Sequence, residues 1–221
     1  MALSKVDYNS INVTAAASKA LKWNSTPNGF ETGDVGGSLT LIKTLTASSS
    51  GTLSFVNGTS DVVLNNTYPI YLFKFINIHF ATDDTDFRFN VSIDSGSNYN
   101  VAKTTTMFRT YHGEDGSSGG VSYSTSEDLA QGTGDAYLNW DVGAASDENV
   151  SGEMWLFNPS STTFVKHFIA RTSSVHSGSA ELEAYQAGYA NTTSAINAVQ
   201  FKGTSGNIDA GTFKLYGIKD S

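Results

Sequence analysis

The stretch GSSGG at 116–120 has the Gly-x-Ser-x-Gly spacing of a serine-hydrolase nucleophile elbow, with Ser118 in the nucleophile position. Such an elbow needs a strand before the serine and a helix after it, because the hydroxyl must project from a sharp turn. Here a Gly/Ser loop leads directly into VSYSTS (121–126), which has the composition of a strand. The sequence therefore predicts a flexible loop at 116–120 and no catalytic serine.

Acidic side chains are densest at Asp83, Asp84 and Asp86, with Asp94 a few residues further on. Calcium takes about six to eight oxygen ligands, so an acid-rich segment of this kind is a candidate calcium site. The spacing is not that of a calcium-binding loop, and aspartate is also a common turn residue. We therefore expect a turn with exposed carboxylates and no cofactor, and we keep calcium at Asp83, Asp84 and Asp86 as the alternative.

The histidines are scattered over four segments of the chain: His79, His112, His167 and His176. His112 stands beside Glu114 and Asp115, so it could bind a metal or transfer a proton. A lone histidine next to acids in a loop is more often a solvated side chain, and that is our expectation for His112. His79 and His167 fall inside apolar segments, where a core or interface role is expected.

Carbohydrate chemistry is a further possibility. Glycoside hydrolysis needs two carboxyl groups about 5–10 Å apart across a cleft. Nothing in the sequence marks such a pair among the available acids, which include Glu153, Glu181, Glu183, Asp128 and Asp135. Sugar binding without hydrolysis would instead use exposed rings as stacking platforms, for which the candidates are Trp140, Tyr123, Tyr137 and Tyr189. Aromatic residues at strand positions mostly belong to the core, so we predict no catalytic residue.

The composition limits the class of protein further. The 221-residue chain has 15% charged residues, a net charge of −8 and no cysteine. The negative charge opposes nucleic-acid binding, which depends on clustered Lys and Arg. The lack of cysteine excludes disulfides and Cys-type zinc sites. No apolar run approaches the ~18 residues of a membrane span, and the opening MALSKVDYNS has no apolar stretch of the kind found in secretory signals.

Strand signals follow one another from Ser38 onward, separated by turn residues at the spacing typical of a β-sandwich. WLFNPSSTTFVKHFIA (155–170) predicts two antiparallel strands around a Pro-Ser-Ser-Thr-Thr connector, and 38–46 with 51–58 predicts a first hairpin. The segment 69–80 is apolar on both faces, which indicates a central strand. We predict an all-β fold over 37–221, a jelly-roll-like antiparallel β-sandwich, with a closed barrel as the alternative.

Residues 1–36 differ from the rest of the chain and are predicted to form an N-terminal arm and linker. The small residues of 11–23 favour a short helix, and the Pro/Gly-rich stretch 24–37 favours a linker. Two alternatives are open for this arm: it is a flexible terminus, or it docks on a neighbouring subunit. In the docking hypothesis the contact residues are Leu21, Trp23 and Phe30.

Three stretches carry a resemblance to a known group of proteins: MALSKVDYNSI at the start, residues 71–100, and residues 194–219 preceded by LFNPSSTTFVKHFIA. They resemble virion proteins of tailed bacteriophages, particularly marine and cyanobacterial phages. The resemblance implies a β-rich, non-enzymatic structural protein of the particle, displayed in symmetric copies. Most phage tail fibres are longer and carry repetitive shafts, which this chain lacks, so capsid decoration stays open beside a tail role.

These observations together predict a virion structural protein, made in the bacterial cytoplasm and exposed on the particle. Our leading hypothesis is a short tail fibre or adaptor that contributes to host attachment, and the alternatives are a capsid decoration (cement) protein and a glycan-binding or depolymerase module. Expected partners are further copies of the chain in a trimer or higher symmetric assembly, because symmetry removes exposed sheet edges. Other expected partners are tail or major capsid proteins and a host surface glycan, without nucleic acid or membrane.

Overall fold

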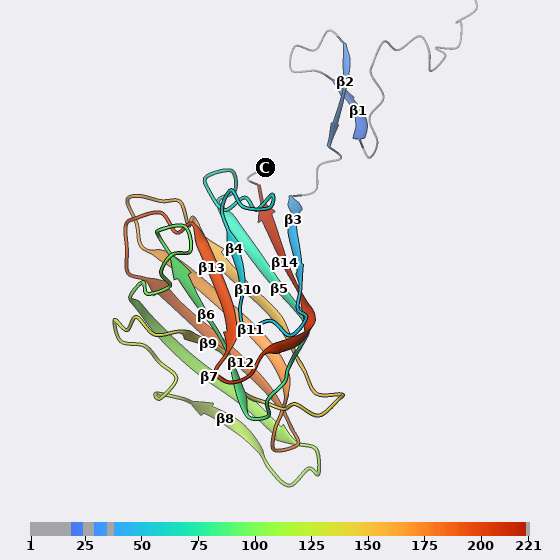
Figure 1. The fold of residues 1–221 in the computed structure, drawn as a ribbon, viewed down its shortest axis with the longest axis vertical. Helices are drawn as coiled ribbons and strands as arrows, with labels where there is room; N and C mark the ends of the chain where they lie inside the picture. Colours follow the sequence, from blue (N-terminus) through green and yellow to red (C-terminus); the bar gives the residue numbers. More distant parts are fainter. Residues whose placement is uncertain (1–18, 24–28, 35–37, 220–221) are drawn as a thin grey trace, which may run out of the picture. The chain divides into compact units, whose positions relative to one another are not determined.

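The computed structural model describes residues 19–23, 29–34 and 38–219, and the chain divides into two compact units, Met1–Gly37 and Ser38–Ser221. Every regular element in these described ranges is a β-strand (Figure 1). No helix capable of spanning a membrane occurs in the same ranges.

The N-terminal unit contains one antiparallel hairpin, in which β1 (Lys19–Trp23) pairs with β2 (Phe30–Asp34). The predicted helix over 11–23 is therefore wrong for residues 19–23, and residues 11–18 lie outside the described ranges. The predicted linker over 24–37 is also wrong in part, because it contains β2. The apolar residues Leu21 and Trp23 are two positions apart, the spacing of residues on one face of a strand. The rings of Trp23 and Phe30 face each other across the hairpin and stack with 4.4 Å between centroids.

The larger unit is built on an antiparallel sheet that extends from β3 to β8 (Figure 1). Its strands, in order of pairing, are β3 (Leu39–Thr46), β14 (Ile208–Ile218), β5 (Ile70–Phe80), β10 (Val150–Phe157), β11 (Lys166–His176), β12 (Ala180–Ala190), β7 (Lys103–Gly113) and β8 (Gly119–Tyr123). We call it the wide sheet. As predicted, β5 is a central strand, since it pairs with both β14 and β10.

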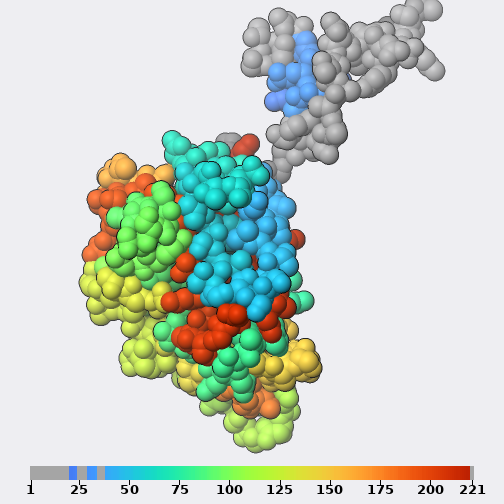
Figure 2. Space-filling model, in the orientation of Figure 1, coloured from blue at the N-terminus to red at the C-terminus, as the bar shows by residue number. Residues whose placement is uncertain are grey.

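Four further strands form a smaller sheet, called here the narrow sheet. In order of pairing they are β9 (Ala136–Val142), β6 (Thr85–Ser92), β13 (Ala198–Gly203) and β4 (Leu53–Val56). A single residue pair, His176 with Val142, joins β11 to β9 and so connects the two sheets. The segment after β3 also bridges to the first residue of β14, through Ser50 and Ile208. Figure 2 shows blue and red atoms in contact on this surface.

The core lies between the two sheets, and phenylalanine is its most frequent residue type. The ring of Phe75 on β5 packs edge to face against Phe87 on β6 at 5.0 Å and against Phe201 on β13 at 5.1 Å. Phe168 on β11 meets Phe89 on β6 at 4.9 Å in the same way. All five rings are at most 2% exposed. The prediction of an all-β antiparallel sandwich is thus confirmed.

One local expectation about strands is wrong. Residues 38–46 and 51–58 do not form a hairpin, because β3 pairs with β14 and β4 pairs with β13. Residues 136–142 form strand β9, which the sequence analysis did not predict. In both cases long-range pairing decides the outcome over the local pattern. The hairpin around 155–170 is confirmed, since Leu156 of β10 faces Phe168 of β11.

The chain crosses repeatedly between the two sheets. The strands of each pair β3–β4, β5–β6, β9–β10 and β13–β14 lie in different sheets, although they follow one another in sequence. The hairpins β7–β8 and β11–β12 instead both join the wide sheet and broaden it. The inner side of this broadened part packs on β9 through a small second cluster of Met107, Leu182 and Ala184 with Tyr137 and Trp140.

Candidate functional site

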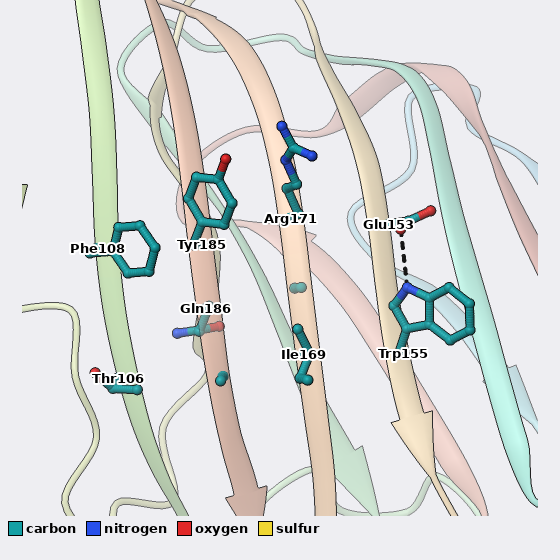
Figure 3. Close-up of a pocket in the computed structure, with 10 residues that line it drawn as sticks. Thr106, Phe108, Glu153, Trp155, Ile169, Arg171, Tyr185 and Gln186 are labelled. Carbon is teal, nitrogen blue, oxygen red and sulfur yellow. Dashed lines mark hydrogen bonds between the residues drawn. The ribbon is translucent and has the colours of Figure 1, made fainter. Parts of the chain in front are cut away.

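The outer face of the wide sheet, which points away from the narrow sheet, carries an open groove of about 340 Å³. Trp155 of β10 faces Ile169 of β11, which faces Ala187 of β12, which faces Thr106 of β7. Figure 3 shows these side chains on four adjacent strands. Ile169 is 52% exposed although it lies in the middle of a sheet. The groove is therefore an apolar strip that crosses the sheet perpendicular to its strands.

One aromatic pair forms the wall of the groove toward β7. The rings of Phe108 and Tyr185 lie parallel, with 4.7 Å between centroids and 4° between planes. The guanidinium of Arg171 lies 5.2 Å from the Tyr185 centroid, within the range of a cation–π contact. The Tyr185 hydroxyl donates to Glu183 at 2.8 Å, and this hydrogen bond raises the pKa of Tyr185.

A row of alternating charges runs beside the apolar strip. Lys74 of β5 pairs with Glu153 of β10 at 3.0 Å, and Arg171 of β11 pairs with Glu183 of β12. The indole N–H of Trp155 also donates to Glu153 at 3.1 Å (Figure 3). Burial raises the pKa of Glu153, but the hydrogen bonds from Lys74 and Trp155 outweigh it and the net pKa is lowered. The four charges next to the apolar strip thus form two ion pairs, Lys74 with Glu153 and Arg171 with Glu183.

Ser118 lies in the turn between β7 and β8, where its carbonyl accepts the Gly113 N–H at 2.8 Å. The segment after it is strand β8 and not a helix. The strand-to-helix turn of a nucleophile elbow is therefore absent around Ser118. The predicted loop at 116–120 is found at 116–118, whereas Gly119 and Gly120 already belong to β8.

The acidic residues at 83–86 each serve a different structural contact. Asp83 accepts the Ala144 N–H at 3.0 Å, Asp84 accepts the Ser177 hydroxyl at 2.9 Å, and Asp86 pairs with Arg88 at 2.8 Å. Among the described residues there is no group of three or more His, Cys, Asp or Glu side chains placed to hold a metal ion. These contacts tie the loop before β6 to the segments that follow β9 and β11.

Asp141 at the end of β9 completes this acidic cluster, a residue that the sequence did not single out. Its backbone N–H is bonded to Asp86 at 3.3 Å, and its carboxylate lies 3.7 Å from His176. Burial and the neighbouring charges of Asp84 and Asp86 raise its pKa to about 6. Burial lowers the pKa of His176, so the histidine adds little positive charge at neutral pH.

The remaining histidines do not meet one another. His79 contacts Asp209 through Nδ1 at 2.7 Å and the Ala145 carbonyl through Nε2 at 3.1 Å. His167 lies on the exposed side of β11, with its ring 5.8 Å from Tyr189, and His112 is exposed on β7. These positions are those of isolated surface or part-buried side chains.

The proposed sugar platforms differ in how open they are. Arg109 covers the ring of Trp140 at 3.5 Å, and Arg88 covers the ring of Tyr137 at 3.9 Å, so these two faces are occupied. Tyr123 is 59% exposed, with its hydroxyl donating to Asp128. The Tyr189 hydroxyl accepts the Gln131 amide at 3.2 Å. Only Tyr123 among the four candidates therefore keeps a largely open ring.

A second hollow, of about 490 Å³, lies on the opposite side of β7 from the groove. It is lined by Arg109, Trp140, His176 and the hydroxyl residues Ser118 and Ser122. The Nη1 of Arg109 is buried there without a hydrogen-bond partner among the described residues. A buried guanidinium nitrogen with free N–H groups favours an incoming acceptor oxygen.

The arm residues Leu21, Trp23 and Phe30 are 49%, 62% and 41% exposed within their hairpin. Their contact with a neighbouring subunit stays a prediction.

Comparison of the chain with protein-family models, with curated proteins and with solved structures gave no match. Its function therefore has to be inferred from the geometry of its own residues.

Sequence reasoning missed the groove, although one signal for it was present. Strand β11 alternates between buried and exposed positions, and Ile169 occupies an exposed position between His167 and Arg171. A β-branched apolar residue at a solvent-facing position of an alternating strand, where polar residues are expected, indicates a contact surface. The contributions of Phe108 and Tyr185 could not be found in this way, since they depend on the pairing of β7 with β12.

Proposed function

We propose that the protein is a non-enzymatic structural protein of a tailed-bacteriophage virion, a short tail fibre or adaptor, and that the outer face of the wide sheet binds its protein partners. This proposal rests on the exposed apolar strip around Ile169, which lies beside the ion pairs Lys74–Glu153 and Arg171–Glu183. Such a surface favours a protein partner over an ionic one, because apolar area is gained and no unpaired charge is buried.

The path of the chain supports this proposal. Wide-sheet strands β3, β14, β5 and β10 face narrow-sheet strands β4, β13, β6 and β9. Along the chain these eight strands alternate between the two sheets, except that β6 and β9 both lie in the narrow sheet. We infer that these eight strands form the double Greek key of a jelly roll, to which the hairpins β7–β8 and β11–β12 are additions. Jelly rolls are used repeatedly in viral capsid and lectin domains. The phage-like stretches named above add to this support.

The capsid-decoration role remains an alternative within the same class. Immunogold labelling of intact particles and quantitative mass spectrometry distinguish the two roles. A tail protein labels the tail and is present in a few dozen copies or fewer, whereas a decoration protein labels the shell in hundreds of copies. Absence of the protein from purified particles would overturn both.

Glycan binding is the second candidate function, and the hollow around Arg109 favours it. The ring of Tyr111, the hydroxyl groups of Ser118 and Ser122 and the unpartnered guanidinium nitrogen line this hollow, and proteins hold sugars with groups of these kinds. Glycan-array binding that is lost in Arg109→Met would establish this role. Release of oligosaccharides from host surface glycans by the purified protein would instead show an enzyme and contradict the non-enzymatic proposal.

A further inference from the structure

Strand β8 lies at the margin of the wide sheet and, among the described strands, pairs with β7 alone (Figure 1). Its sequence GGVSY contains no charge and no proline. Natural proteins usually protect such edges with charges, prolines or short strands, because an open row of backbone groups recruits another strand. The margins at β3 and β4 follow this rule, since β3 carries Lys43 and β4 has 4 residues. The edge of β8 is therefore left open.

The hydrogen bonds at both ends of β8 show which of its backbone groups are free. The Gly113 N–H donates to Ser118 at 2.8 Å, and the Ser124 N–H donates to Met107 at 3.2 Å. In an antiparallel ladder, alternate residues bond to the same neighbour. Gly120 and Ser122 consequently bond toward β7. The N–H and C=O groups of Gly119, Val121 and Tyr123 point away from the sheet.

We propose that β8 pairs antiparallel with β8 of a second copy, across a two-fold axis that passes beside Val121. In this register Val121 faces Val121 of the second copy, and Gly119 faces Tyr123. Each facing pair is of the hydrogen-bonded type and exchanges both backbone bonds. Every free N–H and C=O group of β8 is then satisfied, and the two wide sheets become one continuous sheet.

The side chains are compatible with this register. Val121 faces Thr110 of β7 and Tyr123 faces Phe108, so both project from the groove side of the sheet, where they are 73% and 59% exposed. Val121 would gain an apolar partner in its own copy, a favourable cross-strand pair. Tyr123 would lie over Gly119, which has no side chain to clash with the ring. No like charges meet along the strand.

The pairing deepens the proposed structural role, because it names one partner of the particle protein as a second copy of the chain. It also bears on the trimer or higher symmetric assembly expected from the sequence, since a two-fold contact does not form a trimer but can occur in a higher symmetric assembly. A closed two-fold interface uses the same surface on both copies. The two proposals fail separately: this one is decided by purified protein in solution, and the virion role by location on particles.

Cross-linking of the full chain tests the contact directly, because the chain contains no cysteine of its own. In a hydrogen-bonded antiparallel pair the Cα atoms lie about 5.5 Å apart, within the range of about 4.4–6.8 Å that a disulfide spans. Mild oxidation of Val121→Cys should therefore give a covalent dimer. The matched control is Phe164→Cys, a 70% exposed position in the loop between β10 and β11. Equal cross-linking rates for the two variants would overturn the proposal.

Opposite charges test the position of the two-fold axis. Only a residue on the two-fold axis faces the same residue of the second copy. Val121→Lys and Val121→Glu should therefore each be monomeric alone, because like charges would face each other. Mixed together, they should form a one-to-one heterodimer, which sedimentation equilibrium measures. Val121→Thr keeps the backbone N–H and the β-branched shape and should remain dimeric. Failure of the mixed variants to associate, or a wild-type chain that is monomeric at every concentration, would refute the pairing.

Proline at the same position tests the backbone bonds. Val121→Pro removes the outward N–H of each copy but none of the bonds from β8 to β7. The loss of both central bonds should weaken the dimer about 30-fold. A dimer of unchanged affinity would show that another surface holds the copies together. The charge variants decide the matter if the proline variant does not fold.

Discussion

The ring of Phe108 on β7 lies face to face with the ring of Tyr185 on β12, although the two residues are far apart in the sequence. Parallel offset rings contribute about 0.5–1.5 kcal/mol beyond the area that they bury. Phe108 nevertheless remains 44% exposed. The stack thus fixes a rigid aromatic wall that is still open to a partner, which is the property expected of a preformed binding surface.

The apolar strip should matter for assembly far more than for folding. Ile169→Thr keeps a β-branched residue in β11 and should change the free energy of unfolding by less than about 0.5 kcal/mol, because Ile169 is already half exposed. The amount of the Ile169→Thr variant incorporated into particles should fall at least about fivefold, because losing an interface contact of about 1 kcal/mol in binding free energy has an effect of this size. Urea denaturation and quantitative blotting of purified particles measure the two effects.

The control for this experiment is Phe164→Thr, which removes an even more exposed apolar side chain outside the groove. Incorporation of this variant should equal that of the wild type. If Ile169→Thr and Phe164→Thr behave alike, the groove is not the surface through which the protein assembles.

Folding should depend on Phe201 more than on any exposed aromatic residue. Phe201 is fully buried at the meeting point of the two sheets, with the rings of Phe73, Phe75 and Phe213 at 5.1–5.6 Å. Phe201→Ala should lower the free energy of unfolding by about 3–5 kcal/mol, since the cavity cannot close between two rigid sheets. Chemical denaturation measures the change. A loss below about 1 kcal/mol would contradict the described packing of the core.

The larger unit should fold without the N-terminal unit. Residues 38–221 contain both sheets and the whole phenylalanine core, and they form a separate compact unit. A fragment of these residues should keep the β-type circular dichroism spectrum and the urea midpoint of the full chain. The same fragment should fail to join particles if Leu21, Trp23 and Phe30 are assembly contacts. A fragment that is unfolded would refute the first expectation, and normal incorporation would refute the second.

The sequence predicted the elements whose signals are local. The central strand over 69–80 is apolar on both faces and the hairpin over 155–170 has a clear turn, so both were found from their residues alone. The strand at 136–142 was not predicted, and its main pairing partner, β6, lies far away in the sequence. The first hairpin failed for the same reason, as β3 and β4 find better partners near the end of the chain.

The candidate site was less accessible to prediction than the fold. Trp140 and Tyr137 are prominent in the sequence, but Arg109 and Arg88 cover their rings, and both contacts join different strands. The groove depends on the register of four strands, which no single segment specifies. The acidic cluster was noticed at 83–86, whereas Asp141 joins it only through the fold.

Asp141 should make the protein less stable as the pH rises. Burial and the charges of Asp84 and Asp86 raise its pKa from 3.8 to about 6, against the opposing effect of Arg109. The folded state therefore binds this proton more tightly than the unfolded state, and the resulting stabilisation is complete below pH 3.8 and lost as the pH rises to about 6. Above that pH, Asp141 is ionised in the folded protein although its surroundings favour the neutral form, and this lowers the stability of the fold.

Asp141→Asn should remove this penalty. Asparagine tolerates the positive φ of 44° at this position and cannot ionise. At pH 8 the variant should be more stable than the wild type by about 1 kcal/mol, a value reduced from the full pKa shift because solvent screens a partly exposed group. At pH 3.5 the two proteins should have equal stability. Urea denaturation at both values of pH provides the measurement.

Asp94→Asn is the matched control, because its shift has the opposite sign. Hydrogen bonds from Ser92 and Asn98 lower the pKa of Asp94 from 3.8 to about 2. Its stabilising effect is therefore fully present above pH 3.8 and is lost as the pH falls to about 2. At pH 8 this variant should be less stable than the wild type, while Asp141→Asn is more stable. If both substitutions change stability in the same direction at pH 8, the clustering of Asp141 with Asp84 and Asp86 does not govern its ionisation.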